Sequence, residues 1–428
     1  MTVKEKLTFF RQSLWMVIAN TLAGVFMMVS QTIASTMPAE EYGVFFTLLR
    51  FFTLLTIPAA GLQTVLAQQA AEAITEEAQR NLNSSLRTVL LGTFIVWALT
   101  CFVVLIFRET ILQGLKIQNP WALWMMMILV LSALWLPIIQ GIVHGRQNFL
   151  VLGASMIGNG FGRFIGVVLM VFFFGGYAAG AITGTWIGVT LGLIIAAWSI
   201  RRVIMGASGR FEPWIWTQRV LPLTFGTGSI LFMMNLDMLV VQSHFPKELT
   251  SYYAASAMIG IAVITFTTPM AAVMFPKIAH SKATAQKSNA LYLALLGTVG
   301  LVGIGALLCT LWPELPLRII YFRSPQFLKS AVLIPWFAWA VVPLTIANVM
   351  VNGLLALGRF QIVPWLVGIA VAYGFTLMTF AARWQHAEPF VAFRNIIITL
   401  GCFGTLLLVV AVYFTRRQMN AEASAGNP

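Results

Sequence analysis

Residues 150–200 read LVLGASMIGNGFGRFIGVVLMVFFFGGYAAGAITGTWIGVTLGLIIAAWSI, and in this stretch Arg163 is the only Asp, Glu, Lys or Arg. The two apolar runs, 150–174 and 177–200, are each long enough to cross a hydrocarbon core of about 30 Å as a helix. Glycines recur every four residues in both runs, at 158, 162 and 166 and again at 176, 180, 184, 188 and 192. Small residues at this spacing let helix backbones approach closely, so the stretch predicts two tightly packed membrane helices.

The rest of the chain has the same character. Of its 428 residues, 59% are apolar and 9% are charged, and the mean hydropathy is +0.87. Because soluble domains carry about 25% charged residues, this composition excludes an ordinary soluble enzyme. Apolar spans are expected at 12–34, 42–66, 87–107, 121–143, 150–174, 177–200, 220–243, 252–275, 290–312, 331–356, 362–382 and 393–415. Barrel strands are nearer ten residues and alternate in polarity, so these twelve spans predict an all-α polytopic membrane protein.

The basic residues indicate how the chain crosses the membrane. The net charge is +13, but the Lys and Arg residues lie in short loops between spans, so we expect no nucleic-acid partner. With the N-terminus in the cytoplasm, 16 of them fall on the cytoplasmic side and 8 on the outer side. The positive-inside rule therefore favours two cytoplasmic termini. The three cysteines lie within spans without metal-ligand spacing, so no metal site is expected.

An internal repeat divides the sequence into two halves. Pro38, acidic residues, a tyrosine, an apolar helix and Pro58 are echoed about 210 residues later, at 246–280. The halves predict an N-terminal six-helix lobe at 1–205, a cytoplasmic linker at 206–219, a C-terminal six-helix lobe at 220–416 and a short tail at 417–428. Six spans per half give parallel repeats, an arrangement in which two lobes rock around a substrate cavity. Chance likeness between apolar helices is the alternative.

Short motifs in both halves resemble a known family. Glu41-Tyr42-Gly43-Val44-Phe45 with Pro58 to Gln63, and Asn235-Leu236-Asp237 with Tyr252 to Ala255, are similar to bacterial polysaccharide and oligosaccharide flippases. These flippases belong to the multidrug/oligosaccharidyl-lipid/polysaccharide exporter superfamily. The resemblance implies a V-shaped two-lobe bundle, a cavity lined by helices one, two, seven and eight, and a lipid-diphosphate-linked glycan as cargo. Charge within the spans is sparser here than in several members of the family.

Three full charges fall well within spans, namely Arg50, Arg163 and Asp237. Because each costs about 2.5–3.5 kcal/mol to insert, such residues are expected to face the bundle interior or water. Arg163 lies near the midplane, where its guanidinium fork suits a diphosphate; the alternative is a structural arginine that bonds helix carbonyls.

Arg50 and Asp237 lie at similar depths, about 13 Å and about 10 Å below the outer surface. They can form an outer gate pair, or each can be satisfied separately. A buried Asp237 carboxylate can instead carry a proton or sodium ion in exchange for cargo. Neutral polar residues in the spans either bind sugar hydroxyls in a wet cavity or bond neighbouring helices. These are Asn20, Gln31, Gln63, Asn235 and Asn348.

The sequence therefore predicts a transporter and not an enzyme. We expect a flippase that moves a polyprenyl-diphosphate-linked oligosaccharide across the bacterial plasma membrane by alternating access, for cell-surface polysaccharide biosynthesis. The alternatives are a cation-coupled multidrug exporter of the same superfamily and a non-transporting subunit of a polysaccharide-synthesis complex. We expect a monomer in contact with membrane lipid, with no cofactor, whose partners can include a glycan polymerase or glycosyltransferases.

Overall fold

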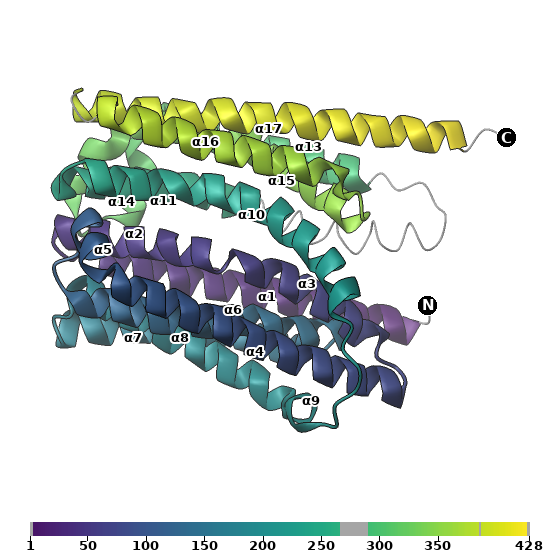
Figure 1. The fold of residues 1–428 in the computed structure, drawn as a ribbon. Coiled ribbons are helices and arrows are strands. Elements are labelled where there is room, and N and C mark those ends of the chain that lie inside the picture. The colour runs from purple at the N-terminus through teal and green to yellow at the C-terminus, as the bar shows by residue number, and fades with distance from the viewer. Residues whose placement is uncertain (1–2, 266–289, 385–386, 426–428) are drawn as a thin grey trace. The chain divides into compact units, whose positions relative to one another are not determined.

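The computed structural model describes residues 3–265, 290–384 and 387–425, and these residues form helices joined by short turns, without a β-strand among them (Figure 1). The N-terminal helices are α1 Val3–Ala34, α2 Ala39–Leu55, α3 Ile57–Glu72, α4 Glu76–Ile106, α5 Arg108–Gly114, α6 Pro120–Gly145, α7 Phe149–Val168, η1 Leu169–Phe173, α8 Tyr177–Ser199 and α9 Arg201–Met205. The later ones are α10 Pro213–His244, α11 Lys247–Thr265, α13 Ala290–Leu311, α14 Glu314–Ile320, η2 Pro325–Leu333, α15 Ile334–Ala356, η3 Phe360–Ile362, α16 Val363–Trp384 and α17 Pro389–Ala425.

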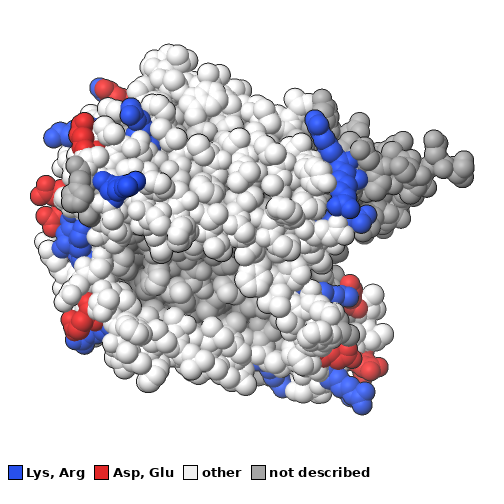
Figure 2. All heavy atoms as spheres, turned by 45° about the horizontal axis from the view of Figure 1, so that its top comes forward, with Lys and Arg blue, Asp and Glu red and all other residues white. Residues whose placement is uncertain are grey.

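Many of these helices have the length and apolarity of membrane spans. Within the described residues, eight helices pass that test, and ten pass if each of two bent pairs forms one span. On the face drawn in Figure 2, charged side chains gather toward the two ends of the helices and leave an uncharged band between them. The chain is therefore a multi-pass membrane protein whose described residues form an all-helical fold. The full count of twelve spans stays a prediction, because the second half of the expected span 252–275 lies outside the described residues.

The chain divides into two compact units, Met1–Thr224 and Phe225–Pro428. Unit 1 contains α1 to α9 and the beginning of α10, and unit 2 contains the remainder of α10 and the helices that follow. The boundary falls inside a continuous helix, two residues after Pro222.

Helix starts in unit 1 follow from polar residues just outside the apolar runs. Thr75 Oγ1 accepts a hydrogen bond from the backbone N–H of Ala78 at 3.2 Å, and Asn148 Oδ1 accepts one from Val151 at 3.3 Å. These caps satisfy backbone N–H groups that the first helical turn leaves free. The two caps fix where α4 and α7 begin.

Glycines bring α7 and α8 together as the sequence predicts. A Cβ on Gly162 would lie 3.0 Å from the Cα of Gly188, and a Cβ on Gly166 would lie 2.7 Å from the Cα of Gly184. On another face of α7, a Cβ on Gly160 would lie 2.8 Å from the carbonyl oxygen of Ala23 in α1. Since no larger residue fits at these positions, the glycine stripe sets a three-helix layer of α1, α7 and α8 (Figure 1).

The expected kink in the second span is present. Helices α2 and α3 form one bent pair with an angle of 44°, and Pro58 lies in the first turn of α3. Proline lacks the N–H that a continuous helix would need at this point, so the break follows from the sequence. Pro269, its expected counterpart in the second half, lies outside the described residues.

Aromatic side chains build the core of unit 2. The Tyr253 ring of α11 meets the rings of Phe337 in α15 and Phe393 in α17 edge-on, with centroids 5.1 Å and 5.3 Å apart. Phe245, the residue that follows α10, packs on the same Phe393 ring, with the ring centroids 5.0 Å apart. In unit 2, large buried rings thus fill the space between helices, whereas in unit 1 glycines bring the backbones of α7 and α8 into close contact.

Candidate functional site

Arg163 belongs to a column of polar residues on one face of α7. Ser155, Asn159 and Arg163 follow one another at four-residue spacing, which places them on one side of a helix; we call them the α7 polar column. Ser155 is fully buried and its hydroxyl donates to the carbonyl oxygen of Gly192 at 2.8 Å, while Gln140 Nε2 donates to Ser155 Oγ at 3.0 Å. At the Ser155 end of the column, the hydrogen-bonding groups therefore have protein partners.

The other two members of the column differ from Ser155. Nε of Arg163 and Oδ1 of Asn159 are both enclosed, and neither has a hydrogen-bond partner among the residues that the structure describes. A buried donor or acceptor left without a partner costs about 1–3 kcal/mol, so such groups are uncommon in folded proteins. An unused donor and an unused acceptor one turn apart are therefore a candidate ligand site.

Glycines of α8 hold this column in place. A Cβ on Gly188 would lie 2.4 Å from the backbone nitrogen of Arg163, and one on Gly192 would lie 3.0 Å from the Cβ of Asn159. The α8 backbone therefore passes directly beside the column. This close packing fixes the backbone from which both polar side chains project.

Arg50 lies at the end of a continuous buried stretch of α2 that begins at Tyr42. Its side chain is 8% exposed, and its guanidinium carbon lies 4.7 Å from the centre of the Phe46 ring. A cation over an aromatic face is stabilised by the ring quadrupole. Arg50 is thus a buried cation of unit 1 and does not face lipid.

Asp237 is the buried anion of unit 2. It is 3% exposed, and the fully buried hydroxyl of Tyr253 donates to its Oδ2 at 2.6 Å. Tyr373 of α16 is also fully buried, and its hydroxyl has no hydrogen-bond partner among the described residues. Arg50 and Asp237 lie in different units, and their pairing across an outer gate stays a prediction.

The neutral polar candidates occupy varied surroundings. Asn235 is buried and donates to the carbonyl oxygen of Leu231 at 2.6 Å, and Asn348 accepts from Asn352 at 2.9 Å, so each makes a bond along its own helix. Gln31 is 7% exposed, and its Oε1 has no hydrogen-bond partner in the described part of the chain. Gln63 is half-buried and Asn20 is exposed. A role for any of the five in binding sugar stays a prediction.

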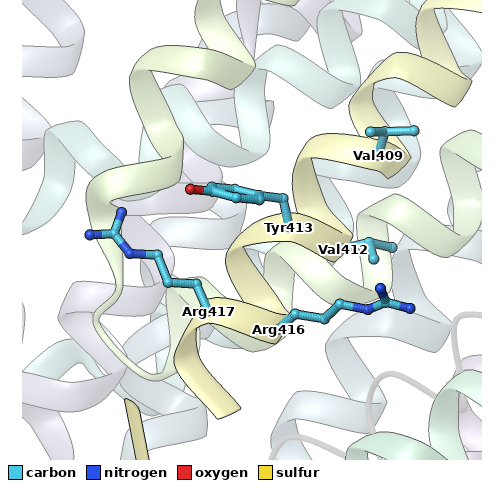
Figure 3. Close-up of a pocket in the computed structure, with 5 residues that line it drawn as sticks. All are labelled: Val409, Val412, Tyr413, Arg416 and Arg417. Carbon is cyan, nitrogen blue, oxygen red and sulfur yellow. The ribbon is translucent and has the colours of Figure 1, made fainter. Parts of the chain in front are cut away.

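Two hollows lie away from these residues. One of about 480 Å³ is lined by Val409, Val412, Tyr413, Arg416 and Arg417 of α17, and Figure 3 shows the two arginines extending to different sides of the helix. Another of about 340 Å³ lies at the turn between α3 and α4. Neither includes a predicted site residue, and the α17 arginines and tyrosine have the composition of a membrane interface.

Sequence reasoning missed Ser155, Asn159, Tyr253 and Tyr373 as site residues. The four-residue spacing of the α7 polar column is visible in the sequence, and it was a signal that could have found Asn159. Tyr253 lies 16 residues from Asp237 on the following helix, so its contact with the carboxylate depends on how α10 and α11 pack. No periodicity in the sequence points to it.

Comparison with known proteins relates the fold to transporters. No family model matches the sequence, and no curated protein matches it. Solved structures do match. An inward-facing multidrug resistance MATE family transporter of the MOP superfamily has a TM-score of 0.76 at 10% identity, with 97% of this chain and 99% of that chain covered. Lipid II flippase MurJ in an inward closed conformation has a TM-score of 0.70 at 16% identity, with 93% and 87% covered.

This chain has the fold of MOP superfamily transporters. A third solved structure with this fold is a MOP superfamily transporter from Pyrococcus furiosus, with a TM-score of 0.67 at 14% identity and 96% and 95% of the chains covered. That transporter is described as having a binding pocket of reverse polarity, which suggests a different function for it. The fold is therefore shared by proteins named for different cargo, and cargo has to be argued from this chain's own residues.

Proposed function

We propose that this chain is a flippase that moves a lipid-diphosphate-linked oligosaccharide across a bacterial plasma membrane, with both termini in the cytoplasm. The observation that carries the proposal is Arg163, a membrane-embedded arginine with an enclosed Nε that meets no acceptor in the described residues. A guanidinium stays charged and presents a planar fork of donors, which matches the oxygens of a diphosphate. An anionic headgroup would supply the hydrogen-bond acceptors that the protein does not provide for this guanidinium.

The balance of charge in unit 1 supports an anionic cargo. Arg50 and Arg163 are its cations within spans, whereas the acidic residues Glu40 and Glu41 lie in the first turn of α2. In the proposed cycle the headgroup enters from the cytoplasm, gains contact with these arginines as the helices of unit 1 move, keeps its polyprenyl tail in lipid, and leaves on the outer side. The fold shared with lipid II flippase MurJ supports this use.

Asp237 is proposed as the gate or ion-coupling residue in unit 2. A buried carboxylate can take up a proton or a sodium ion, and moving one charge through 100 mV supplies about 2.3 kcal/mol. Tyr253 already donates to Oδ2 at 2.6 Å, which orients the carboxylate. In this role, Asp237→Asn slows transport while Arg163 still binds cargo.

Two other functions are set against this one. A multidrug exporter is supported by the fold shared with MATE transporters, but it needs an acidic cavity for cations, and Asp237 is the only Asp in the sequence. A non-transporting subunit of a polysaccharide-synthesis complex would need the glycan polymerase or glycosyltransferases as partners. Transport by the protein alone separates the flippase from that subunit.

The deciding experiment reconstitutes the protein in proteoliposomes with a fluorescent polyprenyl-diphosphate disaccharide and measures headgroup translocation with a membrane-impermeant quencher. We expect wild-type translocation, and a loss of about tenfold or more in Arg163→Lys, since a lysine keeps the charge but loses the fork. Arg202→Gln, at an exposed arginine of α9, is the matched control and should transport normally.

A parallel assay with a lipophilic organic cation tests the exporter. Uptake of that cation by wild type, with no translocation of the lipid-linked disaccharide, would replace the flippase by the exporter. Normal disaccharide translocation by Arg163→Lys would remove diphosphate recognition from the proposal.

A further inference from the structure

Residues 204–210, which are the end of α9 and the first part of its connection to α10, are held against α4 by one arginine. Arg87 Nε donates to the carbonyl oxygen of Ile204 at 2.8 Å, and one terminal nitrogen donates to Ser208 Oγ at 2.8 Å. The other terminal nitrogen donates to the carbonyl oxygen of Gly206. A single guanidinium therefore satisfies three acceptors spread over five residues of the connection, which only a planar fork of donors can do.

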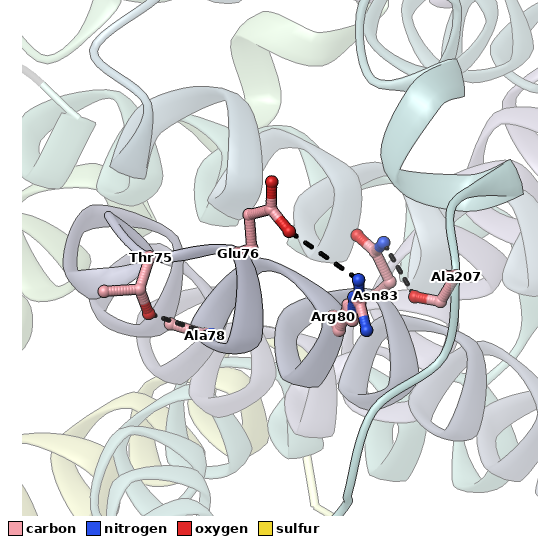
Figure 4. Close-up of polar contacts among 6 residues, drawn as sticks. All are labelled: Thr75, Glu76, Ala78, Arg80, Asn83 and Ala207. Atoms are coloured by element: carbon pink, nitrogen blue, oxygen red, sulfur yellow. Dashed lines mark hydrogen bonds and ion pairs between the residues drawn. The ribbon is translucent and has the colours of Figure 1, made fainter.

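Neighbouring residues of α4 extend the contact. Asn83 Nδ2 donates to the carbonyl oxygen of Ala207 at 3.1 Å, the contact drawn in Figure 4. The backbone N–H of Arg210 donates to Asn81 Oδ1 at 2.8 Å, and that of Gly209 donates to the carbonyl oxygen of Arg80 at 3.0 Å. We call the set Asn81, Asn83 and Arg87 with their bonds to 204–210 the α4 clamp.

Two glycines make this approach possible. A Cβ on Gly206 would lie 2.3 Å from Asn83 Nδ2, and a Cβ on Gly209 would lie 2.3 Å from Asn81 Oδ1. Side chains at either position would push the connection off the helix. Because composition rich in glycine usually indicates a flexible linker, the sequence suggests mobility here, while the contacts require close docking.

The beginning of α10 is fixed to unit 1 as well. Trp216 and Val220 pack against the core that Leu66, Leu86 and Ile142 build, and a Cβ on Gly61 of α3 would lie 2.3 Å from Thr224 Oγ1. From Ile204 to Thr224 the chain is thus attached to unit 1 first by polar bonds and then by apolar packing.

We propose that the α4 clamp, together with the packing of Trp216 to Thr224, makes the chain from Ile204 to Thr224 a rigid part of unit 1, so that α10 leaves unit 1 from a fixed point and this segment does not absorb movement during transport. Arg87, Asn83 and Asn81 are positioning residues in this device. The transport part of the inference rests on the proposed function, whereas the rigidity of the connection does not.

Hydrogen exchange on the full-length protein in nanodiscs tests the rigidity. We expect the amides of Gly209 and Arg210 to be protected in wild type and to exchange about tenfold or more faster in Arg87→Gln, because loss of three charge-assisted bonds opens the segment. Arg87→Lys should also open it, since one ammonium cannot reach all three acceptors. Arg202→Gln is the control and should match wild type.

A second variant tests the clamp independently, in case the Arg87 variants misfold. Gly206→Ala leaves every clamp residue in place but inserts a methyl group against Asn83, and it should raise exchange at 204–210 and speed trypsin cleavage after Arg210. Unprotected amides in wild type, or equal exchange in wild type and Arg87→Gln, would overturn the clamp.

Transport is then measured in the same proteoliposome assay. We expect the variants with faster exchange at 204–210 to translocate the glycan more slowly than wild type. A variant that has faster exchange but transports at the wild-type rate would overturn the role of the clamp in transport. If wild type moves no lipid-linked glycan but keeps the exchange pattern, the proposed function fails while the rigid connection stands.

Discussion

The buried charges of the two units are satisfied in different ways. In unit 2 the Asp237 carboxylate accepts a 2.6 Å hydrogen bond from Tyr253, within a shell of interlocked aromatic rings. In unit 1 the enclosed Nε of Arg163 has no acceptor among the described residues, although the helix that carries it is packed as closely as backbones allow. One charge has a protein partner and the other has a fixed position with spare hydrogen-bonding capacity.

This difference separates two kinds of functional residue. A charge that the protein itself satisfies can change state only if its partner moves, which suits a gate or a coupling site. A charge held rigidly with spare donors is prepared for a ligand that brings its own acceptors. The comparison therefore supports our proposal that the α7 polar column recognises cargo and that Asp237 controls the cycle.

The largest effect on stability is expected at Gly188, where α8 packs against the α7 polar column. Gly188→Ala places a methyl carbon 2.4 Å from the backbone nitrogen of Arg163, and separating α7 from α8 should destabilise unit 1 by about 2–3 kcal/mol. Gly92→Ala in α4 is the matched control, because no atom lies within 4 Å of the added carbon. Thermal unfolding in detergent measures both, and equal melting temperatures would mean that the glycine stripe does not fix the column.

The aromatic shell of unit 2 offers a matched pair of tyrosines. Tyr253→Phe removes the donor to a buried carboxylate and should cost about 2 kcal/mol of stability. Tyr373→Phe removes a buried hydroxyl with no hydrogen-bond partner in the described residues, so it should cost no stability and can gain about 1 kcal/mol. Thermal unfolding of the two variants measures the contrast. A larger loss in Tyr373→Phe would reverse the assignment of the carboxylate's main partner.

Hydropathy and glycine spacing were enough to predict several of the long helices and one of their contacts. The runs 150–174 and 177–200 correspond to α7 with η1 and to α8, and the glycines at 162, 166, 184 and 188 meet as expected. The bend at Pro58 was also predictable, because proline cannot continue a helix. These features depend on residues near one another in sequence, or on one repeated spacing.

The α4 clamp and the Tyr253–Asp237 bond could not be predicted in this way. Arg87 contacts residues 117 to 121 positions later, and nothing in its own surroundings in the sequence distinguishes it from a loop arginine of the positive-inside kind. Asn83 likewise reaches its partner 124 positions away. Such bonds depend on where a short connection returns to an earlier helix, and hydropathy carries no information on that.

A smaller effect, with the opposite sign, is expected from Arg163→Met. Methionine keeps much of the length of the side chain but removes the donor without a partner, so the unloaded protein should become more stable by about 1 kcal/mol. The same variant should lose translocation of the lipid-linked glycan. Thermal unfolding without cargo and the proteoliposome assay measure the two effects. A fall in stability would show that Arg163 holds the bundle together and is not reserved for a ligand.

The smallest effect concerns Glu41, which bridges two elements of unit 1. Its Oε2 accepts a hydrogen bond at 3.1 Å from the backbone N–H of Ala178, in the first turn of α8, where the positive end of the helix dipole favours an anion. Glu41→Gln can keep the bond but loses the charge, so we expect a loss of about 0.5 kcal/mol. Glu40→Gln, in the same first turn of α2, removes the charge next to α2 alone, and the difference between the two variants isolates the contribution at α8. If the two variants have the same stability, Glu41 stabilises only its own helix, and the Ala178 end of the α7–α8 pair depends on the glycines alone.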